Sequence, residues 1–160
     1  MGADLTVACY RNGTLASDRA IATSNDLIFG YRTKIRRTNG KLIATCGQSQ
    51  NGVAFQEWFE AGEPEDKKPD LDNDFSALVI EPDRTIKLYN NKLYAYVSET
   101  DYAAIGNGDH CAMGAMFMGA SAEEAVRAAC AHVLGCGGGV DVLRLAVTHE
   151  ASPAPASQVI

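Results

Sequence analysis

The sequence has no uninterrupted apolar run that approaches the ~20 residues needed for a membrane-spanning helix. Its first residues, Met1-Gly2-Ala3-Asp4, contain no basic region and become polar at once, which does not fit a secretory signal peptide. We therefore expect a cytoplasmic protein that has no membrane partner.

Basic residues are also comparatively scarce. The chain has 14 Lys and Arg residues against 20 Asp and Glu residues, which gives a net charge of −6. This balance argues against nucleic acid and against an anionic membrane surface as partners. The hydrophobic content of 46% and the charged content of 21% are ordinary for a globular protein.

The length of 160 residues fits one domain, since domains usually contain roughly 100–200 residues. We expect that domain to span residues 1–148. Residues 149–160 include Pro153 and Pro155 and are expected to form a mobile C-terminal tail.

The chain has no CxxC motif and no other cysteine spacing typical of a metal site. Its cysteines are odd in number and stand mostly among apolar residues, which favours reduced thiols over a disulfide framework. They are Cys9, Cys46, Cys111, Cys130 and Cys136. The Gly135–Gly139 segment lacks the Lys-Ser/Thr pair of a phosphate-binding loop and precedes a strand pattern rather than a helix pattern. We therefore expect neither a metal nor a cofactor.

The N-terminal segment predicts a β-hairpin that brings a hydroxyl close to a carboxylate. Asn12-Gly13 is a strong hairpin signal, because both central residues of a two-residue turn of this kind need positive φ. Residues that are small or favour strands precede the turn from Thr6 onward and follow it from Thr14. Pairing of Arg11 with Thr14 would place Asp18 near the level of Thr6.

A second Asn-Gly pair, Asn39-Gly40, predicts another hairpin between residues 34–38 and residues 41–46. The apolar residues of its second strand predict burial on both faces. Immediately afterwards the hydrophobic period changes from that of a strand to that of a helix. Ser49 or Asn51 is expected to cap this helix at its start.

The rest of the chain alternates again between strand and helix patterns. Strands are predicted over residues 75–80, 85–89, 94–97 and 140–147. Alternation in the first three implies one buried face. Helix patterns follow Gly106-Asn107-Gly108 and the capping box Ser121-Ala-Glu-Glu124. Two antiparallel sheets with helices on both outer faces would bury this order of elements.

Five residues in the predicted N-terminal strands carry a resemblance to a known family. Thr6, Asp18-Arg19, Lys34 and Gly47 resemble the motif residues of proteasome β-type peptidases and HslV-like proteases, which are N-terminal-nucleophile (Ntn) hydrolases. The resemblance covers roughly residues 5–147. It implies an α+β fold, the four-layer αββα sandwich, and a cytoplasmic ring homo-oligomer that acts on peptides or unfolded proteins. It leaves open whether an ATP-dependent unfoldase is a partner.

The resemblance also implies roles for individual residues. Thr6 would be the nucleophile, activated by its own free α-amino group, whose pKa near ~8 suits a base. Lys34, paired with Asp18, would tune the site electrostatically, and the N–H of Gly47 would stabilise the oxyanion. Asp18 and Lys34 stand sixteen residues apart, as in the family, and Arg19 also matches.

The segment from Ala20 to Thr23 lines the substrate cleft in the family, and the resemblance implies the same position for Ala20 and Thr23 here. Other positions differ from the family pattern. Asn107 replaces the serine of a Gly-Ser-Gly motif. Val133 and Cys136 replace the aspartate and the hydroxyl residue of a later Asp-x-x-Ser/Thr-Gly motif.

Two functions of different classes remain open. The leading hypothesis is threonine-type hydrolysis of peptide bonds, which requires removal of Met1–Leu5 so that Thr6 gains its free amine. The alternative is a catalytically silent ring or assembly subunit, favoured by Leu5 before Thr6 and by Asn107 and Val133. Cys9 lies further along the strand and is a weaker candidate nucleophile. The enzyme is favoured by the matching residues Asp18, Arg19, Lys34 and Gly47.

Overall fold

The structure is a computed structural model that describes residues 3–4, 6–23, 25 and 27–147. Its described strands form two antiparallel sheets. The larger sheet contains β1 (Ala3–Asp4), β4 (Ala20–Ala22), β5 (Ile28–Tyr31), β6 (Ile35–Thr38), β7 (Lys41–Gln48), β8 (Ser76–Ile80), β9 (Ile86–Asn90) and β10 (Ala95–Ser98). The smaller sheet contains β2 (Val7–Arg11), β3 (Thr14–Asp18), β11 (Tyr102–Gly106) and β12 (Val140–Arg144).

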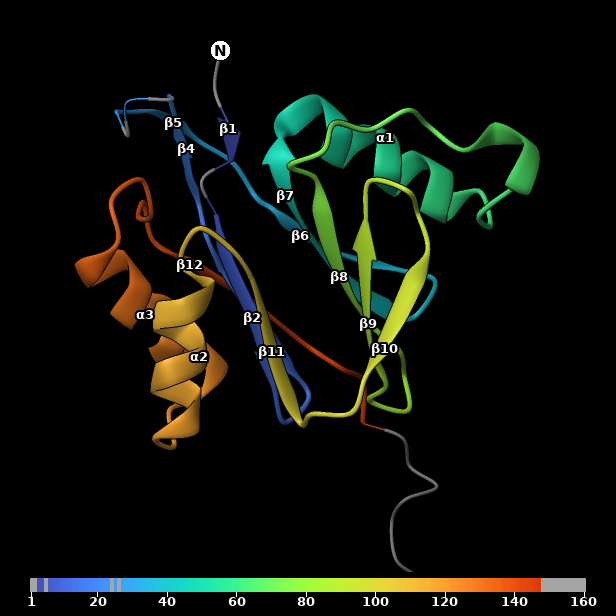
Figure 1. The fold of residues 1–160 in the computed structure, drawn as a ribbon. Coiled ribbons are helices and arrows are strands. Elements are labelled where there is room, and N and C mark those ends of the chain that lie inside the picture. Colours follow the sequence, from blue (N-terminus) through green and yellow to red (C-terminus); the bar gives the residue numbers. More distant parts are fainter. Residues whose placement is uncertain (1–2, 5, 24, 26, 148–160) are drawn as a thin grey trace, which may run out of the picture.

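Helices cover the outer face of each sheet, so the molecule has four layers (Figure 1). Helix α1 (Ser49–Glu60) packs on the larger sheet, and α2 (Asp109–Phe117) and α3 (Ala122–His132) pack on the smaller one. A short 3₁₀ helix spans Glu65–Lys67. Three apolar clusters fill the spaces between successive layers. The predicted αββα sandwich is confirmed.

Both predicted Asn-Gly hairpins form as expected. Asn12 and Gly13 have φ values of 50° and 79°, and Arg11 pairs with Thr14 between β2 and β3. Asn39-Gly40 has φ values of 52° and 77° and joins β6 to β7. These positive φ values are those that a turn matching the right-handed twist of the flanking strands requires. The first hairpin therefore carries Asp18 back to the level of Val7, the residue after Thr6.

A cluster of aromatic side chains packs α1 against the larger sheet. Phe55 is fully buried, and its ring centroid lies 5.2 Å from that of Phe75 and 5.3 Å from that of Tyr89. The prediction that Ser49 or Asn51 caps this helix was wrong. The N-cap is Gln48, whose side chain makes no capping hydrogen bond, because β7 continues to Gln48 and the helix begins at the next residue.

At α3 the predicted capping box is present. The Glu124 N–H donates to Ser121 Oγ at 3.1 Å, and the Ser121 N–H donates to Glu124 Oε2 at 3.0 Å. By contrast, the buried face predicted for residues 94–97 was wrong. Tyr94 and Tyr96 are 72% and 63% exposed, because β10 is the outermost strand and pairs with β9 alone.

The two-residue strand β1 has an unusual place in the larger sheet. It lies between β7 and β4 and is antiparallel to both (Figure 1). Ala3 is opposite Gln48 on one side and opposite Ala22 on the other, and Asp4 is opposite Gly47. Ala3 and Asp4 are therefore held as one strand of the sheet.

Candidate active site

A fully buried ion pair joins the two sheets at the end of β3. Lys34 Nζ lies 2.8 Å from Asp18 Oδ1, and both side chains are 0% exposed. Removing two charges from water costs several kcal/mol per ion, so such a pair contributes little net stability. Its presence is better explained by a functional role for the lysine or the carboxylate.

Backbone N–H groups hold the Asp18 carboxylate in place. The N–H of Val7 donates to Oδ1 at 3.2 Å, and the N–H of Gly137 donates to Oδ2 at 3.0 Å. Burial raises the pKa of Asp18, while the Lys34 ammonium and these N–H groups act in the opposite direction. The carboxylate of Asp18 on β3 thus connects β2, the residue that precedes β6 and the loop after α3.

Thr6 lies next to this network. It is 0% exposed, and its Oγ1 has no hydrogen-bond partner among the described residues. Its chain neighbour Val7 donates to the same Asp18 oxygen that Lys34 contacts. Thr6 is therefore the chain neighbour of a residue whose N–H binds the buried ammonium–carboxylate pair.

The Gly106-Asn107-Gly108 turn fixes the backbone of Thr6. The Gly108 N–H donates to the Thr6 carbonyl oxygen at 3.3 Å. Gly106 has a φ of 95°, and a Cβ atom there would lie 1.9 Å from the same oxygen. Asn107 is exposed in this turn. Only glycine allows this approach, so the turn acts on Thr6 through its backbone.

We expect Gly106→Ala to lower the free energy of unfolding by roughly 1–3 kcal/mol or more, because it combines an unfavourable φ with a backbone clash. Gly114→Ala is the matched control. Gly114 lies within α2, and a methyl group added there would meet no neighbouring atom within 4 Å, so that change should stabilise the protein by up to about 1 kcal/mol. Urea unfolding measures both variants. Equal, small effects would contradict the tight contact with Thr6.

Gly47 lies at the other side of the site, near the end of β7. Its φ is 110°, and a Cβ atom would meet the backbone of Phe75 at 3.2 Å. Gly47 is opposite Asp4 of β1. Its backbone therefore borders the strand position that leads to Thr6.

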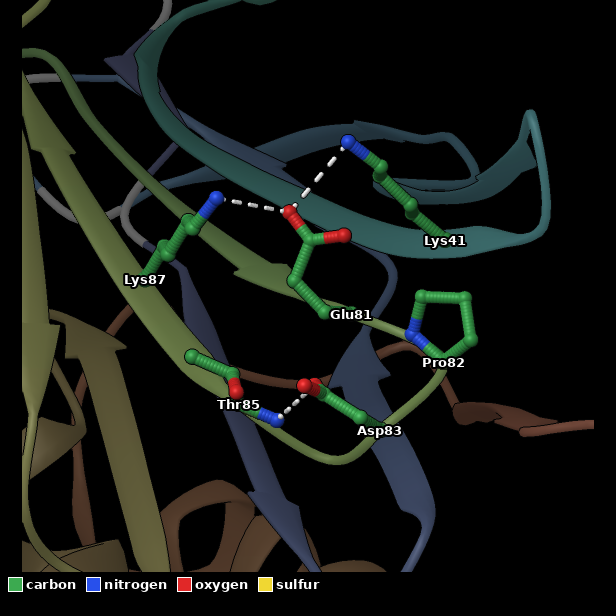
Figure 2. A pocket seen from close by; sticks show the side chains of 6 residues that line it. All are labelled: Lys41, Glu81, Pro82, Asp83, Thr85 and Lys87. Atoms are coloured by element: carbon green, nitrogen blue, oxygen red, sulfur yellow. Dashed lines mark hydrogen bonds and ion pairs between the residues drawn. The ribbon is translucent and has the colours of Figure 1, made fainter.

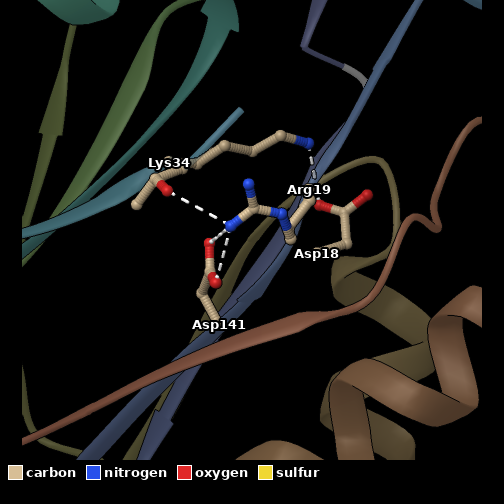
Figure 3. A network of polar contacts seen from close by, with 5 residues as sticks. Asp18, Arg19, Lys34 and Asp141 are labelled. Carbon is tan, nitrogen blue, oxygen red and sulfur yellow. Dashed lines mark hydrogen bonds and ion pairs between the residues drawn. The ribbon is translucent and has the colours of Figure 1, made fainter. Parts of the chain in front are cut away.

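The sequence did not identify Asp141 as part of this network. Arg19 Nη1 lies 2.8 Å from both carboxylate oxygens of Asp141 and donates to Thr33 Oγ1 at 3.3 Å (Figure 3). Asp141 is on β12, opposite Ser17 of β3. It lies in a strand pattern outside the family motifs, so only the β3–β12 register could have revealed it.

The two predicted cleft residues lie on and just after β4. Ala20 is fully buried, and its N–H donates to the Gly137 carbonyl oxygen at 2.9 Å. The Thr23 Oγ1 accepts hydrogen bonds from the N–H groups of Asn25 and Leu27, both at 3.3 Å. The Thr23 hydroxyl is thus engaged by its own turn.

Cys136 is buried in the loop that precedes Gly137. Burial raises the pKa of the Cys136 thiol to about 12, and burial likewise raises the pKa of the Cys9 thiol to about 12, from an ordinary value of 9.0. Both thiols therefore stay protonated at neutral pH, which makes them poor nucleophiles. This disfavours Cys9 as an alternative to Thr6.

We expect Cys9 and Cys136 to resist iodoacetamide at pH 8 in the folded protein, whereas the partly exposed Cys111 reacts first. Peptide mass mapping after a timed reaction measures this order, and unfolding in urea should make the five cysteines equally reactive. The raised pKa values of the Cys9 and Cys136 thiols keep them protonated in the folded state at a pH where the unfolded thiols lose their protons. The free energy of unfolding should therefore fall as the pH rises from about 9 towards 12. Rapid labelling of Cys9 in the folded state would contradict its burial.

A separate surface hollow of about 500 Å³ lies at the turn between β8 and β9 (Figure 2). Lys41 of β7 and Lys87 of β9 point into it from the two strands that flank β8. Both contact Glu81 Oε1, at 3.2 Å and 2.9 Å. The shared Glu81 carboxylate therefore offsets part of the positive charge of the two lysines.

Within the described ranges, no group of three His, Cys, Asp or Glu side chains is arranged to hold a metal ion. No helix in that part of the chain has the length and apolar character needed to cross a membrane.

The fold of this chain is similar to that of solved structures of BPH and HslV. Thiobacillus denitrificans BPH superposes with a TM-score of 0.64 at 18% identity, over 88% of this chain and 98% of that chain. The eukaryotic HslV from Trypanosoma brucei superposes with a TM-score of 0.67 at 18% identity, over 86% and 97% of the two chains. No protein-family model matches the sequence, and no curated protein sequence matches it. At these identities the likeness establishes the fold.

Proposed function

We propose that this chain is a proteasome-like threonine peptidase that hydrolyses peptide bonds after removal of Met1–Leu5. The observation that carries the proposal is the buried Asp18–Lys34 pair, anchored to the backbone of the residue after Thr6. A cation that is kept dry beside a threonine can stabilise negative charge that develops during attack on a carbonyl. The four-layer αββα fold, which is similar to that of the solved HslV structure, supports the same assignment.

In the proposed reaction, cleavage of the Leu5–Thr6 bond exposes the α-amino group of Thr6. This amine takes the hydroxyl proton while Oγ1 attacks the peptide carbonyl. The Gly47 N–H would bind the oxyanion, and the proton then passes to the leaving amine. Water hydrolyses the resulting ester and returns Thr6 to its starting state.

The substrate would bind as an extended strand along β7. The β1 segment shows that the edges of β7 and β4 can accept such a strand in antiparallel pairing on both sides. Arg19 is a supporting residue: its pairing with Asp141 and its backbone contact with Gly137 would hold the base of β4 against the loop that binds Asp18.

Assembly of a cytoplasmic ring homo-oligomer from copies of one domain, residues 1–148, belongs to the same proposal. It rests on the structural likeness to HslV. Mass photometry or native mass spectrometry of the purified protein measures it, and a monomer at micromolar concentration would contradict it.

A catalytically silent ring or assembly subunit is the second candidate, and specific residues favour it. Asn107 is exposed in the turn that holds Thr6, and Val133 packs among the apolar residues beneath the smaller sheet. Neither supplies a hydroxyl or carboxylate to Thr6. In this candidate the chain would keep Leu5 joined to Thr6, and the buried ion pair would be purely structural.

Epoxomicin distinguishes the two candidates, because a solved structure of Thiobacillus denitrificans BPH holds this compound. Protein that starts at Thr6 can be produced by a fusion partner whose protease leaves no extra residue. We expect it to gain the mass of one epoxomicin molecule per chain, while a Thr6→Ala version gains none. Absence of an adduct on folded protein that starts at Thr6 would favour the silent subunit.

A further inference from the structure

Strand β10 forms the outer edge of the larger sheet and is open along one side. It pairs with β9 alone, and no other described backbone group bonds to Ala95–Ser98 (Figure 1). The outward N–H and C=O groups of an edge strand are unpaired and offer a template for another strand. Natural proteins usually protect such an edge with lysine, proline or a bulge. β10 contains no lysine or proline, and its register with β9 is continuous.

The side chains along this edge are apolar or aromatic and face solvent. Tyr94, Tyr96 and Val97 are each more than half exposed. Tyr96 is opposite Leu88, which packs against the core between the sheets, and Val97 is opposite Lys87. Because successive residues of a strand point to opposite faces, exposed apolar area lies on both faces of the edge. Aromatic and β-branched residues are also those that stabilise cross-strand pairs.

The charges at the two ends of β10 have opposite signs. Lys92 precedes the strand, Glu99 and Asp101 follow it, and all three are exposed. None of the ion pairs among the described residues includes any of them. At the basic end, Lys68 Nζ also lies 5.2 Å from the centroid of the Tyr94 ring. A second strand of the same sequence, laid antiparallel along the edge, brings its acidic end to this basic end. The charge pattern is therefore complementary to itself.

We propose that β10 is a self-pairing edge, along which a second copy of this chain adds its own β10 in antiparallel register about a two-fold axis at Tyr96. Tyr96 then lies opposite Tyr96 of the second copy, and Ala95 lies opposite Val97 of that copy on the other face. Such a contact is isologous, so it joins two chains and closes, whereas a ring repeats a heterologous contact. The pairing is thus independent of the proposed ring and of the proposed peptidase reaction.

An axis at Tyr96 is the register that keeps charge out of the paired segment. A two-fold axis normal to the sheet keeps each face of both copies on the same side, so it passes through a residue. At Tyr96 it pairs residues 94–98 with themselves, and that segment contains no charged residue. An axis one residue later sets Ala95 opposite the Glu99 carboxylate. An axis one residue earlier requires pairing by Leu93, which is buried in the cluster beneath α1.

Cysteine cross-linking in the full chain tests the pairing and its register. Directly opposite residues of an antiparallel pair have Cα atoms about 4.5–5.5 Å apart, within reach of a disulfide. We expect the Tyr96→Cys variant, oxidised with copper phenanthroline, to form a covalent dimer at least ~10-fold faster than the parent chain with its five native cysteines.

Tyr94→Cys is the matched control for this cross-link. Tyr94 is more exposed than Tyr96, but the axis places its two copies about 14 Å apart along the strands, which a disulfide does not span. The Tyr94→Cys variant should therefore dimerise no faster than the parent. Equal cross-linking of the two variants would overturn the inference, as would a Tyr96→Cys rate equal to that of the parent.

Charge substitution provides a second test that needs no oxidation. Tyr96→Lys and Tyr96→Glu each set two like charges opposite each other at the axis, which destabilises a strand pair. In sedimentation velocity, we expect either variant alone to associate through this edge at least ~10-fold more weakly than the parent chain. An equimolar mixture should recover the association, because opposite charges then meet. Parent-like association of both single variants, or no recovery in the mixture, would contradict the inference. Since neither test involves catalysis, absence of peptidase activity would reject the proposed function alone.

Discussion

Protein that begins at Thr6 is expected to hydrolyse small peptide substrates, and Thr6→Ala is expected to reduce that rate by roughly 10³-fold or more, to background. The Thr6 hydroxyl is fully buried and has no hydrogen-bond partner among the described residues. Its removal therefore breaks no hydrogen bond among the described residues, and the fold should be preserved. Release of a fluorescent group from short peptides measures the rate.

Thr45→Val is a matched control for this change. Thr45 Oγ1 is also buried and has no hydrogen-bond partner in the described structure. It lies beside Gly52 of α1. Its replacement should leave peptide hydrolysis unchanged. Lys34→Ala, measured on protein verified as folded, should also abolish activity. Equal turnover by the parent protein and the Thr6→Ala and Lys34→Ala variants would remove Thr6 and Lys34 from the reaction.

Lys34→Met is expected to cause the largest loss of stability, about 3–5 kcal/mol, because it leaves the Asp18 carboxylate buried without its counter-ion. Urea unfolding followed by circular dichroism measures the loss. Asp18→Asn should also destabilise, since an amide cannot accept hydrogen bonds at both positions now used by the Val7 and Gly137 N–H groups.

Combining Lys34→Met with Asp18→Asn should cost less than the sum of the two single losses, because no unpaired charge then remains. Additive losses would contradict a direct interaction between the two side chains.

The loss caused by Lys34→Met should depend on pH in a defined direction. Burial already raises the pKa of Asp18, and removal of Lys34 removes the main influence that lowers it. The folded variant then binds a proton that the unfolded chain, with an aspartate pKa near ~3.9, releases at lower pH. Its stability is therefore greatest at low pH and falls as the pH rises through the folded-state pKa. The deficit should be larger at pH 8 than at pH 5, and a constant deficit would contradict this origin.

Local sequence signals predicted the parts of this fold that depend on short-range chemistry. The Asn-Gly turns set the registers of both hairpins, so the proximity of Asp18 to Val7 and Thr6 followed from counting residues. The capping box at Ser121 located the start of α3. Lys34 could be placed only through the family resemblance, since its contact with Asp18 spans two sheets.

The features that could not be predicted depend on pairing between strands that lie far apart in the sequence. Asp141 meets Arg19 because β12 pairs with β3 from far along the chain, and no local pattern encodes that register. The exposure of Tyr94 and Tyr96 depends on the place of β10 at the sheet edge rather than on its alternation. The position of β1 between β4 and β7 depends likewise on non-local strand pairing.

The central claim is that Thr6 becomes the N-terminal nucleophile of an Ntn peptidase. Intact mass spectrometry of the purified, untagged protein, before and after incubation with epoxomicin, tests it most directly. We predict a species that begins at Thr6 and gains one inhibitor molecule per chain. A mass that retains Ala3-Asp4-Leu5, with no adduct, would leave Thr6 without its amine and would contradict the claim in favour of a silent subunit.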